Sequence, residues 1–228
     1  MGEWTVPGYA HVRELGRNGG GRTVLATHSA TGLRVAIRYL AEDRDFRESA
    51  RQVVAVESPN IAGLYEYVES HDGAAMVREY VDGASVRDLT KTSSMGVAAA
   101  LSILKSGLLG LVAAHARGVT HRGYKPENVL VDAAGGAKLA DFAILDADST
   151  PAEDVSAAFA TFVACVTGSQ PGKLPRKLQG LAERTADADA LLAELDGTAR
   201  AAAGTDWEAK GRKELARRVD RSRGRRGR

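Results

Sequence analysis

The sequence has almost no cysteine and few aromatic residues. Cys165 is the single cysteine in 228 residues, which excludes an internal disulfide framework and suits a reducing compartment. We interpret Cys165 as a small buried hydrophobic side chain rather than a reactive thiol. Aromatic residues make up 5% of the chain and hydrophobic residues 44%. The core is therefore expected to consist mostly of Ala, Val and Leu.

A secretory signal and a clear membrane span are also missing. Residues 1–7 contain no basic segment followed by an apolar run, so no signal peptide is predicted. The longest apolar stretch, Met95–Ala116, has Lys105 at its centre, where a charge would cost about 3 kcal/mol in a bilayer. We therefore expect a buried helix there and a cytoplasmic protein.

Charge is concentrated at the C-terminal end. Residues 208–228 contain ten Lys and Arg against three Asp and Glu, a net charge of +7 that leaves −5 on the other residues of a +2 chain. Residues 207–219 could form a basic amphipathic helix, and residues 221–228 have a disordered composition. A solvated tail and a segment on the anionic inner face of a membrane both suit this pattern. Nucleic acid is disfavoured because no aromatic residues are interleaved with the basic ones.

Hydrophobic periodicity divides the chain into a strand-rich and a helix-rich part. Alternating patterns bounded by Gly-rich turns predict an antiparallel sheet that carries one helix. Strands are expected at 9–16, 22–29, 33–40, 61–69 and 74–80, and the helix at 45–56. Later helices are expected at 86–90, 97–117, 154–167, 174–185 and 187–195, with a strand pair at 129–131 and 137–139. This order predicts an α+β fold with two lobes.

One internal stretch carries a known combination of motifs. Residues 121–143 read HRGYKPENVLVDAAGGAKLADFA, which resembles the catalytic loop and the D-F-G metal-binding motif of protein kinases. Three further motifs precede it in the family's order, and a fourth follows it. They are the glycine-rich loop (Leu15–Val24), the V-A-I-K strand (Val35–Arg38), the hinge (Glu79–Val81) and the anchoring helix (Asp154–Pro171). The resemblance is to bacterial, especially actinobacterial, Ser/Thr kinases.

The resemblance implies a bilobal protein-kinase-like fold with a five-stranded N-lobe. It implies an N-lobe and hinge over 1–81, a truncated helical C-lobe over 82–197, and a basic tail over 198–228. It also implies a nucleotide site that would take Mg²⁺-ATP. Its nucleotide-binding positions are Gly16, Asn18, Gly19, Gly21, Thr23, Ala36, Arg38, Glu79, Val81 and Leu130.

Several implied site residues match the family pattern. Lys125 corresponds to the lysine that contacts the transferred phosphate, and Asn128 and Asp141 correspond to the Mg²⁺ ligands. A structural role for Asn128 and Asp141 is an equally good interpretation. His121, Phe142 and Asp154 correspond to structural positions, and Asp154 would hold the catalytic-loop backbone.

Other positions depart from the pattern. Gly123 occupies the place of the catalytic aspartate, and a positioned base contributes about 10²–10⁴-fold in rate. Arg38 replaces the phosphate-gripping lysine, and this exchange is not conservative. Its usual glutamate partner corresponds to Ser49, while Glu48 is one residue, or about 100° of helix, away. The activating ion pair is therefore predicted to be absent.

A further arginine, Arg78, precedes the hinge where an apolar residue is usual. A buried guanidinium needs an acidic partner, and Asp141 and Glu48 are the candidates. Together with Arg38, it is a candidate for blocking the nucleotide cleft.

The activation segment is largely deleted. Twelve residues separate Asp141 from Asp154, where active relatives have several dozen, and no A-P-E motif is present. Ala143 replaces the glycine of D-F-G. The resemblance thus implies that a platform for a peptide substrate is missing.

Together, these departures from the family pattern predict a pseudokinase that acts as a regulatory or scaffolding module for a protein partner. The partner would be another kinase or a phosphothreonine-reading domain, with Thr150 and Thr185 as candidate phosphorylation sites. Two alternatives stay open. One is an atypical ATP-dependent Ser/Thr kinase or other transferase, and the other is a nucleotide-binding switch without turnover.

Overall fold

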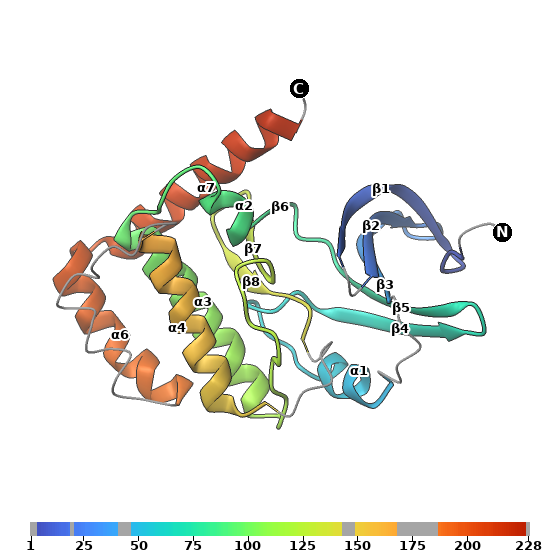
Figure 1. The fold of residues 1–228 in the computed structure, drawn as a ribbon, viewed down its shortest axis with the longest axis horizontal. Coiled ribbons are helices and arrows are strands. Elements are labelled where there is room, and N and C mark those ends of the chain that lie inside the picture. Colours follow the sequence, from blue (N-terminus) through green and yellow to red (C-terminus); the bar gives the residue numbers. More distant parts are fainter. Residues whose placement is uncertain (1–3, 19–20, 41–46, 143–148, 168–186, 227–228) are drawn as a thin grey trace. The chain divides into compact units, whose positions relative to one another are not determined.

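The chain folds into two compact units. The computed structural model describes residues 4–18, 21–40, 47–142, 149–167 and 187–226 (Figure 1). The first unit comprises Met1–Glu57 and Ala62–Tyr80, and the second comprises Ser58–Ile61 and Val81–Arg228. The predicted α+β class, with a five-stranded antiparallel sheet before a mainly helical part, is confirmed.

The first unit is an antiparallel sheet with the strand order β1-β2-β3-β5-β4. One helix, α1 (Arg47–Val54), packs beside β4. Alternating β-branched and small apolar residues produce these strands, because a pleated strand places every second side chain on the same face. The strands are β1 Tyr9–Asn18, β2 Gly21–His28, β3 Arg34–Leu40, β4 Leu64–Ser70 and β5 Gly73–Glu79.

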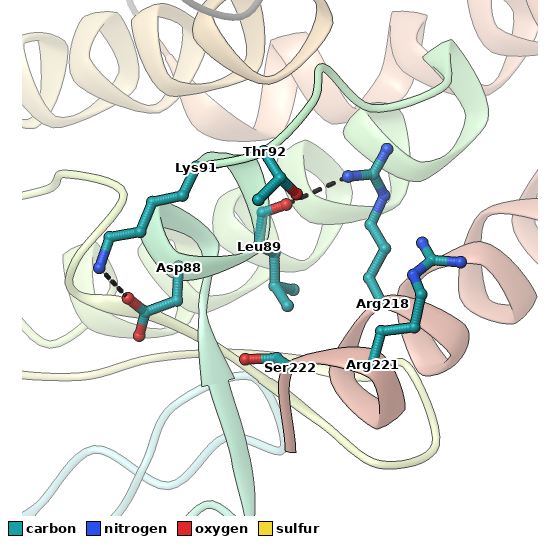
Figure 2. A pocket seen from close by; sticks show the side chains of 7 residues that line it. All are labelled: Asp88, Leu89, Lys91, Thr92, Arg218, Arg221 and Ser222. Carbon is teal, nitrogen blue, oxygen red and sulfur yellow. Dashed lines mark hydrogen bonds and ion pairs between the residues drawn. The ribbon is translucent and has the colours of Figure 1, made fainter. Parts of the chain in front are cut away.

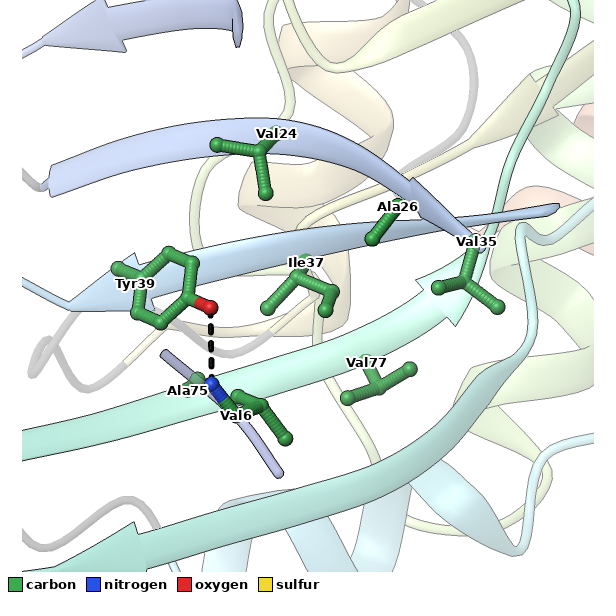
Figure 3. Packing of buried hydrophobic residues seen from close by; sticks show 8 residues of the cluster. All are labelled: Val6, Val24, Ala26, Val35, Ile37, Tyr39, Ala75 and Val77. Carbon is green, nitrogen blue, oxygen red and sulfur yellow. Dashed lines mark hydrogen bonds between the residues drawn. The ribbon is translucent and has the colours of Figure 1, made fainter. Parts of the chain in front are cut away.

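One face of this sheet forms the core of the first unit (Figure 3). Val24, Ile37 and Val77 lie opposite one another on β2, β3 and β5. The segment before β1 covers them through Val6, whose backbone N–H donates to the Tyr39 hydroxyl at 3.0 Å. The sequence motifs gave no sign of this cover, because none of them includes Val6 or Tyr39.

The second unit is built around α3, on which α4, α6 and α7 all pack. A small sheet with the order β6-β7-β8 lies beside these helices. Strand β6 and the extension of α6 beyond residue 195 were not predicted, and the predicted helix at 174–185 lies outside the described residues. The elements are β6 Gly83–Ser85, α2 Val86–Thr90, α3 Val97–His115, β7 Val129–Asp132, β8 Ala137–Leu139, α4 Pro151–Thr167, α6 Ala188–Ala203 and α7 Trp207–Arg226.

Helix α3 is the predicted buried core helix. By length and composition it is also the one helix in the described part of the chain that could cross a membrane. Most of its side chains are buried by the surrounding helices. The one lysine of this helix, Lys105, is paired with residues of α7: its Nζ lies 2.7 Å from Glu208 Oε1 and 5.5 Å from the centre of the Trp207 ring. Cys165, on α4, is buried as predicted, and burial raises the pKa of its thiol to about 12.

The prediction that residues 221–228 are disordered is wrong for the part that is described. Helix α7 continues to Arg226, so it includes most of the basic stretch that begins at residue 221. Trp207, Leu215 and Val219 form its buried face, and the Trp207 indole N–H donates to Asp196 Oδ1 of α6 at 3.2 Å. Packing of this narrow apolar face overrides the high charge of the helix. Helix α6 also runs unbroken across residues 197 and 198, where the tail was predicted to begin.

Two glycines of α7 test how closely it packs. A methyl group at Gly211 would overlap the Ala98 carbonyl and the Ser102 hydroxyl of α3, whereas Gly224 faces open space. We expect Gly211→Ala to lower the free energy of unfolding by about 1–3 kcal/mol through overpacking. The matched change Gly224→Ala should raise it, by up to about 1 kcal/mol, through helix propensity. Urea denaturation measures both, and equal effects would contradict the docking of α7 on α3.

Candidate nucleotide and catalytic site

The loop after α3 is held by one buried carboxylate. Asp154, in the first turn of α4, is 2% exposed. Its Oδ2 accepts the backbone N–H of His121 at 2.7 Å and the ring N–H of His115 Nε2 at 3.0 Å. Its Oδ1 accepts the backbone N–H of Arg122 at 3.2 Å. These bonds hold Arg122 in a left-handed conformation with φ of 56°, which few non-glycine residues adopt unless they are constrained.

The imidazole of His121 lies in an apolar part of the loop. It is fully buried, and its ring centre lies 4.4 Å from that of Phe142 and 5.5 Å from that of Tyr124. Burial lowers the pKa of His121 to about 4, although the carboxylates of Asp154 and Asp141 oppose the shift. The ring is therefore neutral at pH 7 and fills space in the loop.

The position of the catalytic base has no side chain. The carbonyl oxygen of Gly123 accepts the Nδ2–H of Asn128 at 2.9 Å, so the loop at this point is ordered by its backbone. Tyr124, the next residue, is buried with its hydroxyl against Gly107 of α3. Burial raises the pKa of that phenol well above its usual value. Glu127, the one acidic residue of 121–128, pairs instead with Arg87 of α2.

Asn128 keeps an arrangement that suits a metal-bound phosphate. Its backbone N–H donates to Lys125 O at 2.9 Å, and its carbonyl accepts from Ala140 N at 2.8 Å. Its Nδ2 bonds to Gly123, and no hydrogen bond among the described residues uses its carboxamide Oδ1, which could therefore act as a ligand. Asp141 directly follows Ala140 and has a left-handed backbone conformation with φ of 62°. Its carboxylate oxygens are the second candidate ligands.

The donor set is of the kind that Mg²⁺ prefers. Within the described residues, no group of three or more His, Cys, Asp or Glu side chains could hold a metal by itself. Asn128 and Asp141 would therefore need phosphate or water oxygens to complete the coordination of the ion. Lys125, whose side chain is exposed, could contact such a phosphate.

The remaining predicted nucleotide-binding residues lie mostly in the first unit. Gly16 is paired with Thr23 across β1 and β2, and Thr23 is paired with Arg38 across β2 and β3. Gly21 has φ of 123°, which favours glycine. Gly19 and the side chain of Asn18 lie outside the described residues. Val81 and Leu130 belong to the second unit, where Leu130 is half-buried on β7.

Arg38 and Arg78 project from the same face of the first unit's sheet. Arg78 is paired with Ala36, and Arg38 with Met76. Because Ala36 and Arg38 are two residues apart on β3, the two arginines are diagonal neighbours, about 7–8 Å apart in standard sheet geometry. Arg38 is 8% exposed and Arg78 is half-buried. Glu79, paired with Val35, occupies the opposite side of the pleat.

The acidic partners predicted for Arg78 stay predictions. Glu48 is in α1, with its side chain outside the described part of the structure, and Asp141 belongs to the second unit.

Sequence reasoning missed His115, the third group bound to Asp154. The one available signal was its position in the last turn of the long apolar helix, six residues before His121. A histidine at the end of a core helix is not specific enough to predict a bond to a residue 39 positions later.

Removing the charge of Asp154 should destabilise the second unit. We expect Asp154→Asn to lower the free energy of unfolding by roughly 3 kcal/mol, because hydrogen bonds to a charged group contribute about 1.5–3 kcal/mol. The matched change Glu153→Gln alters the preceding residue. Glu153 forms a capping box with Thr150, and glutamine can form the same capping box. Chemical denaturation that finds similar losses for both variants would contradict the anchoring role.

The buried His121 should make stability depend on pH. Its pKa is about 4 when folded and 6.5 for an unperturbed histidine, so the unfolded chain binds the extra proton between these values. Stability should be complete above pH 6.5 and fall as the pH drops towards 4, by roughly 3 kcal/mol from this group.

Variants separate this contribution from that of the carboxylates. In His121→Phe, the slope of unfolding free energy against pH should be smaller by up to one proton over that interval. In His71→Gln, which alters a side chain that is 90% exposed, the slope should stay as in the parent chain. An unchanged slope in His121→Phe would show that His121 takes up its proton equally in the folded and the unfolded chain, and would contradict the lowered pKa.

Comparisons with known proteins agree with this geometry. Residues 9–164 match the protein kinase domain family. The chain is 36% identical over 144 residues to the serine/threonine-protein kinase pkn2 of Myxococcus xanthus, over 58% of this chain and 17% of that protein. It is 30% identical over 193 residues to the serine/threonine-protein kinase PrkC of Bacillus subtilis, over 80% of this chain and 29% of that protein. The chain thus spans less than a third of the length of these relatives.

A solved structure shows the same fold. The kinase domain of Mycobacterium tuberculosis PknI superposes with a TM-score of 0.66 at 24% identity, covering 96% of this chain and 98% of that one. The family match covers more than half of the chain, and the catalytic-loop frame described above lies within it. The chain belongs to the protein kinase family, among relatives that are bacterial Ser/Thr kinases.

Proposed function

We propose that this chain is a catalytically impaired kinase domain, a pseudokinase, that acts as a regulatory or scaffolding protein-interaction module. The observation that carries the proposal is Gly123. The catalytic loop is ordered around it by the bonds of Asp154 and Asn128, yet the position of the base has no group that could accept a proton. In active kinases an aspartate at the position of Gly123 accepts the proton of the substrate hydroxyl.

The first unit supplies a second line of support. Arg38 stands where a lysine grips the phosphates, and Arg78 projects from the same sheet face. A planar guanidinium is wider than an ammonium group and binds phosphate with a different geometry. The backbone positions of Arg38 and Arg78 are diagonal neighbours, about 7–8 Å apart, so this face carries two guanidinium groups where the family pattern has a single lysine.

Binding would then be the main activity. The short interval of twelve residues between Asp141 and Asp154 supports loss of the peptide-substrate platform. A protein partner in the cytoplasm, another kinase or a phosphothreonine-reading domain, is part of this proposal.

Phosphoryl transfer tests the proposal directly. We expect the purified chain, given Mg²⁺ and ATP labelled in the γ-phosphate, to transfer label to itself or to generic protein substrates no faster than Asp141→Asn. Loss of a positioned base alone predicts a rate about 10²–10⁴-fold below that of an active bacterial Ser/Thr kinase assayed in parallel. Transfer that Asp141→Asn abolishes would overturn the proposal in favour of an atypical kinase or other transferase.

A nucleotide-binding switch without turnover is the second candidate, and the available Oδ1 of Asn128 favours it. Asn128, Asp141 and Lys125 would hold the Mg²⁺ and the phosphates, and the bound group would supply charge neutralisation at the loop. Nucleotide at a hundredfold its dissociation constant should stabilise the fold by about 2.7 kcal/mol.

Thermal unfolding with and without Mg²⁺-ATP separates the two candidates. A rise in melting temperature that Asp141→Asn removes, and that the exposed control Asp220→Asn keeps, would support the switch. If the melting temperature rises for none of the three proteins, a protein-binding module that takes no nucleotide would be favoured.

A further inference from the structure

A polar pocket lies in the second unit between α2 and α7. Its volume is about 230 Å³, below the range of about 300–1,000 Å³ typical of sites for drug-sized ligands. Its polar lining residues come from α2 and the turn after it and from the last part of α7 (Figure 2). They are Asp88, Lys91, Thr92, Arg218, Arg221 and Ser222. None of them belongs to the catalytic loop.

Arg218 forms a fixed wall of the pocket. Its side chain is 9% exposed, and its Nε donates to Glu214 Oε1 at 2.9 Å. Its Nη1 donates to the Leu89 carbonyl at 3.1 Å and to the Ser93 carbonyl at 3.2 Å, and its Nη2 donates to the Ser94 carbonyl. The guanidinium thereby orders the turn after α2, and most of its N–H groups are already used.

Lys91, another residue that lines the pocket, is paired with an acidic neighbour. Its Nζ lies 2.7 Å from Asp88 Oδ1, and its side chain is 62% exposed. An exposed pair of this kind contributes little stability and can open when another anion competes for the ammonium group.

Arg221 differs from the other two cations. It is exposed, and none of the described residues forms a hydrogen bond or ion pair with its guanidinium. It follows Arg218 by three positions on α7, and Figure 2 shows both side chains extending from that helix. Like charges at this spacing repel each other on a helix. With Lys91, Arg218, Arg221 and Asp88 counted, the lining carries a net charge of +2.

We propose that this pocket binds a phosphate group, either as free phosphate or as a phosphomonoester on a larger molecule. Arg221 would form the main charge-assisted hydrogen bonds, since a guanidinium fork matches phosphate oxygens. The Thr92 and Ser222 hydroxyls are further donors in the lining, and Arg218 adds fixed positive charge behind them. The small volume fits a phosphate group, and the rest of a larger molecule would lie outside the pocket.

Such a ligand would join α7 to the segment that follows the hinge. Arg223 Nη2, two residues beyond Arg221, already lies 2.8 Å from the carbonyl oxygen and from the side-chain Oδ1 of Asp82. A phosphate bound by Arg221 of α7 and by Thr92, which follows α2, would add a second link between the same two segments.

Nuclear magnetic resonance of the whole ¹⁵N-labelled chain tests the site. Inorganic phosphate is titrated at constant ionic strength, with chloride as the balancing anion. We expect saturable shifts of the Thr92 and Ser222 amide signals. Arg221→Gln should weaken binding about tenfold or more, since one charge-assisted hydrogen-bonding group is lost. Asp88→Asn should strengthen binding, because it removes the competing carboxylate and releases Lys91.

The matched control is Lys210→Gln. Lys210 is an exposed cation on the same helix, paired with Asp206 at 2.8 Å and absent from the pocket lining. The affinity of this variant for phosphate should stay within about twofold of the parent value. Lys210 lies eleven positions before Arg221 on α7, about 16 Å along the helix, where its charge is largely screened. Equal weakening by Arg221→Gln and Lys210→Gln, or shifts that do not saturate, would overturn the proposal in favour of diffuse charge on α7.

The source of the phosphate is decided by a second titration. A short peptide with one phosphothreonine is compared with its unphosphorylated form and with inorganic phosphate. Tighter binding of the phosphopeptide identifies a phosphoprotein, and equal binding of peptide and inorganic phosphate identifies free phosphate. Binding to vesicles that contain phosphatidylserine, with no response to either phosphate probe, would overturn the proposal and favour a membrane surface.

Discussion

The hydrogen bonds of the buried Asp154 carboxylate are the constraint on which the second unit depends. Through them the first turn of α4 is joined to the end of α3 and to the backbone of the catalytic loop. A buried charge is tolerated only when its hydrogen-bonding capacity is used, so these elements specify one another's positions. The same bonds fix the left-handed Arg122, and from there the chain passes to Gly123 and Asn128. None of these contacts involves a reacting group, which is why a loop with the kinase arrangement can persist where the base is missing.

The basic C-terminal helix is the second element that gives the unit its form. Glu214 of α7 accepts the Gly96 N–H at the start of α3 at 3.1 Å, where a negative charge is favoured by the helix dipole. Arg218 holds the turn before α3, and Glu208 pairs with the lysine in the middle of α3. Through these contacts part of a highly charged helix stabilises the fold, while other cations of the same helix, among them Arg217 and Arg221, remain exposed. The helix that stabilises the fold is thus the same helix that lines the proposed phosphate pocket.

The sequence was sufficient to predict the fold, because the fold depends on local patterns and on the order of motifs, whereas the roles assigned to the catalytic-loop residues stay predictions. Alternation predicted the strands of the sheet, and the apolar stretch around Lys105 predicted α3. The cover of the first unit's core by Val6 and Tyr39, the bond of His115 to Asp154, and the continuation of α7 through Arg226 were not predicted. Each depends on residues far apart in sequence, as with Arg218 and Ser93, which are 125 positions apart. Composition describes the charge of such a segment but not the surface on which it packs.

We infer that the catalytic loop is held by its internal contacts and needs no nucleotide or turnover to form. Native-state hydrogen exchange at the backbone amides of His121 and Arg122 measures this directly, since both donate to Asp154. We expect these amides to exchange only through opening nearly as costly as global unfolding, with the same protection in the absence and presence of Mg²⁺-ATP. Rapid exchange without nucleotide, followed by strong protection once Mg²⁺-ATP is added, would contradict it and would indicate a loop organised by its ligand.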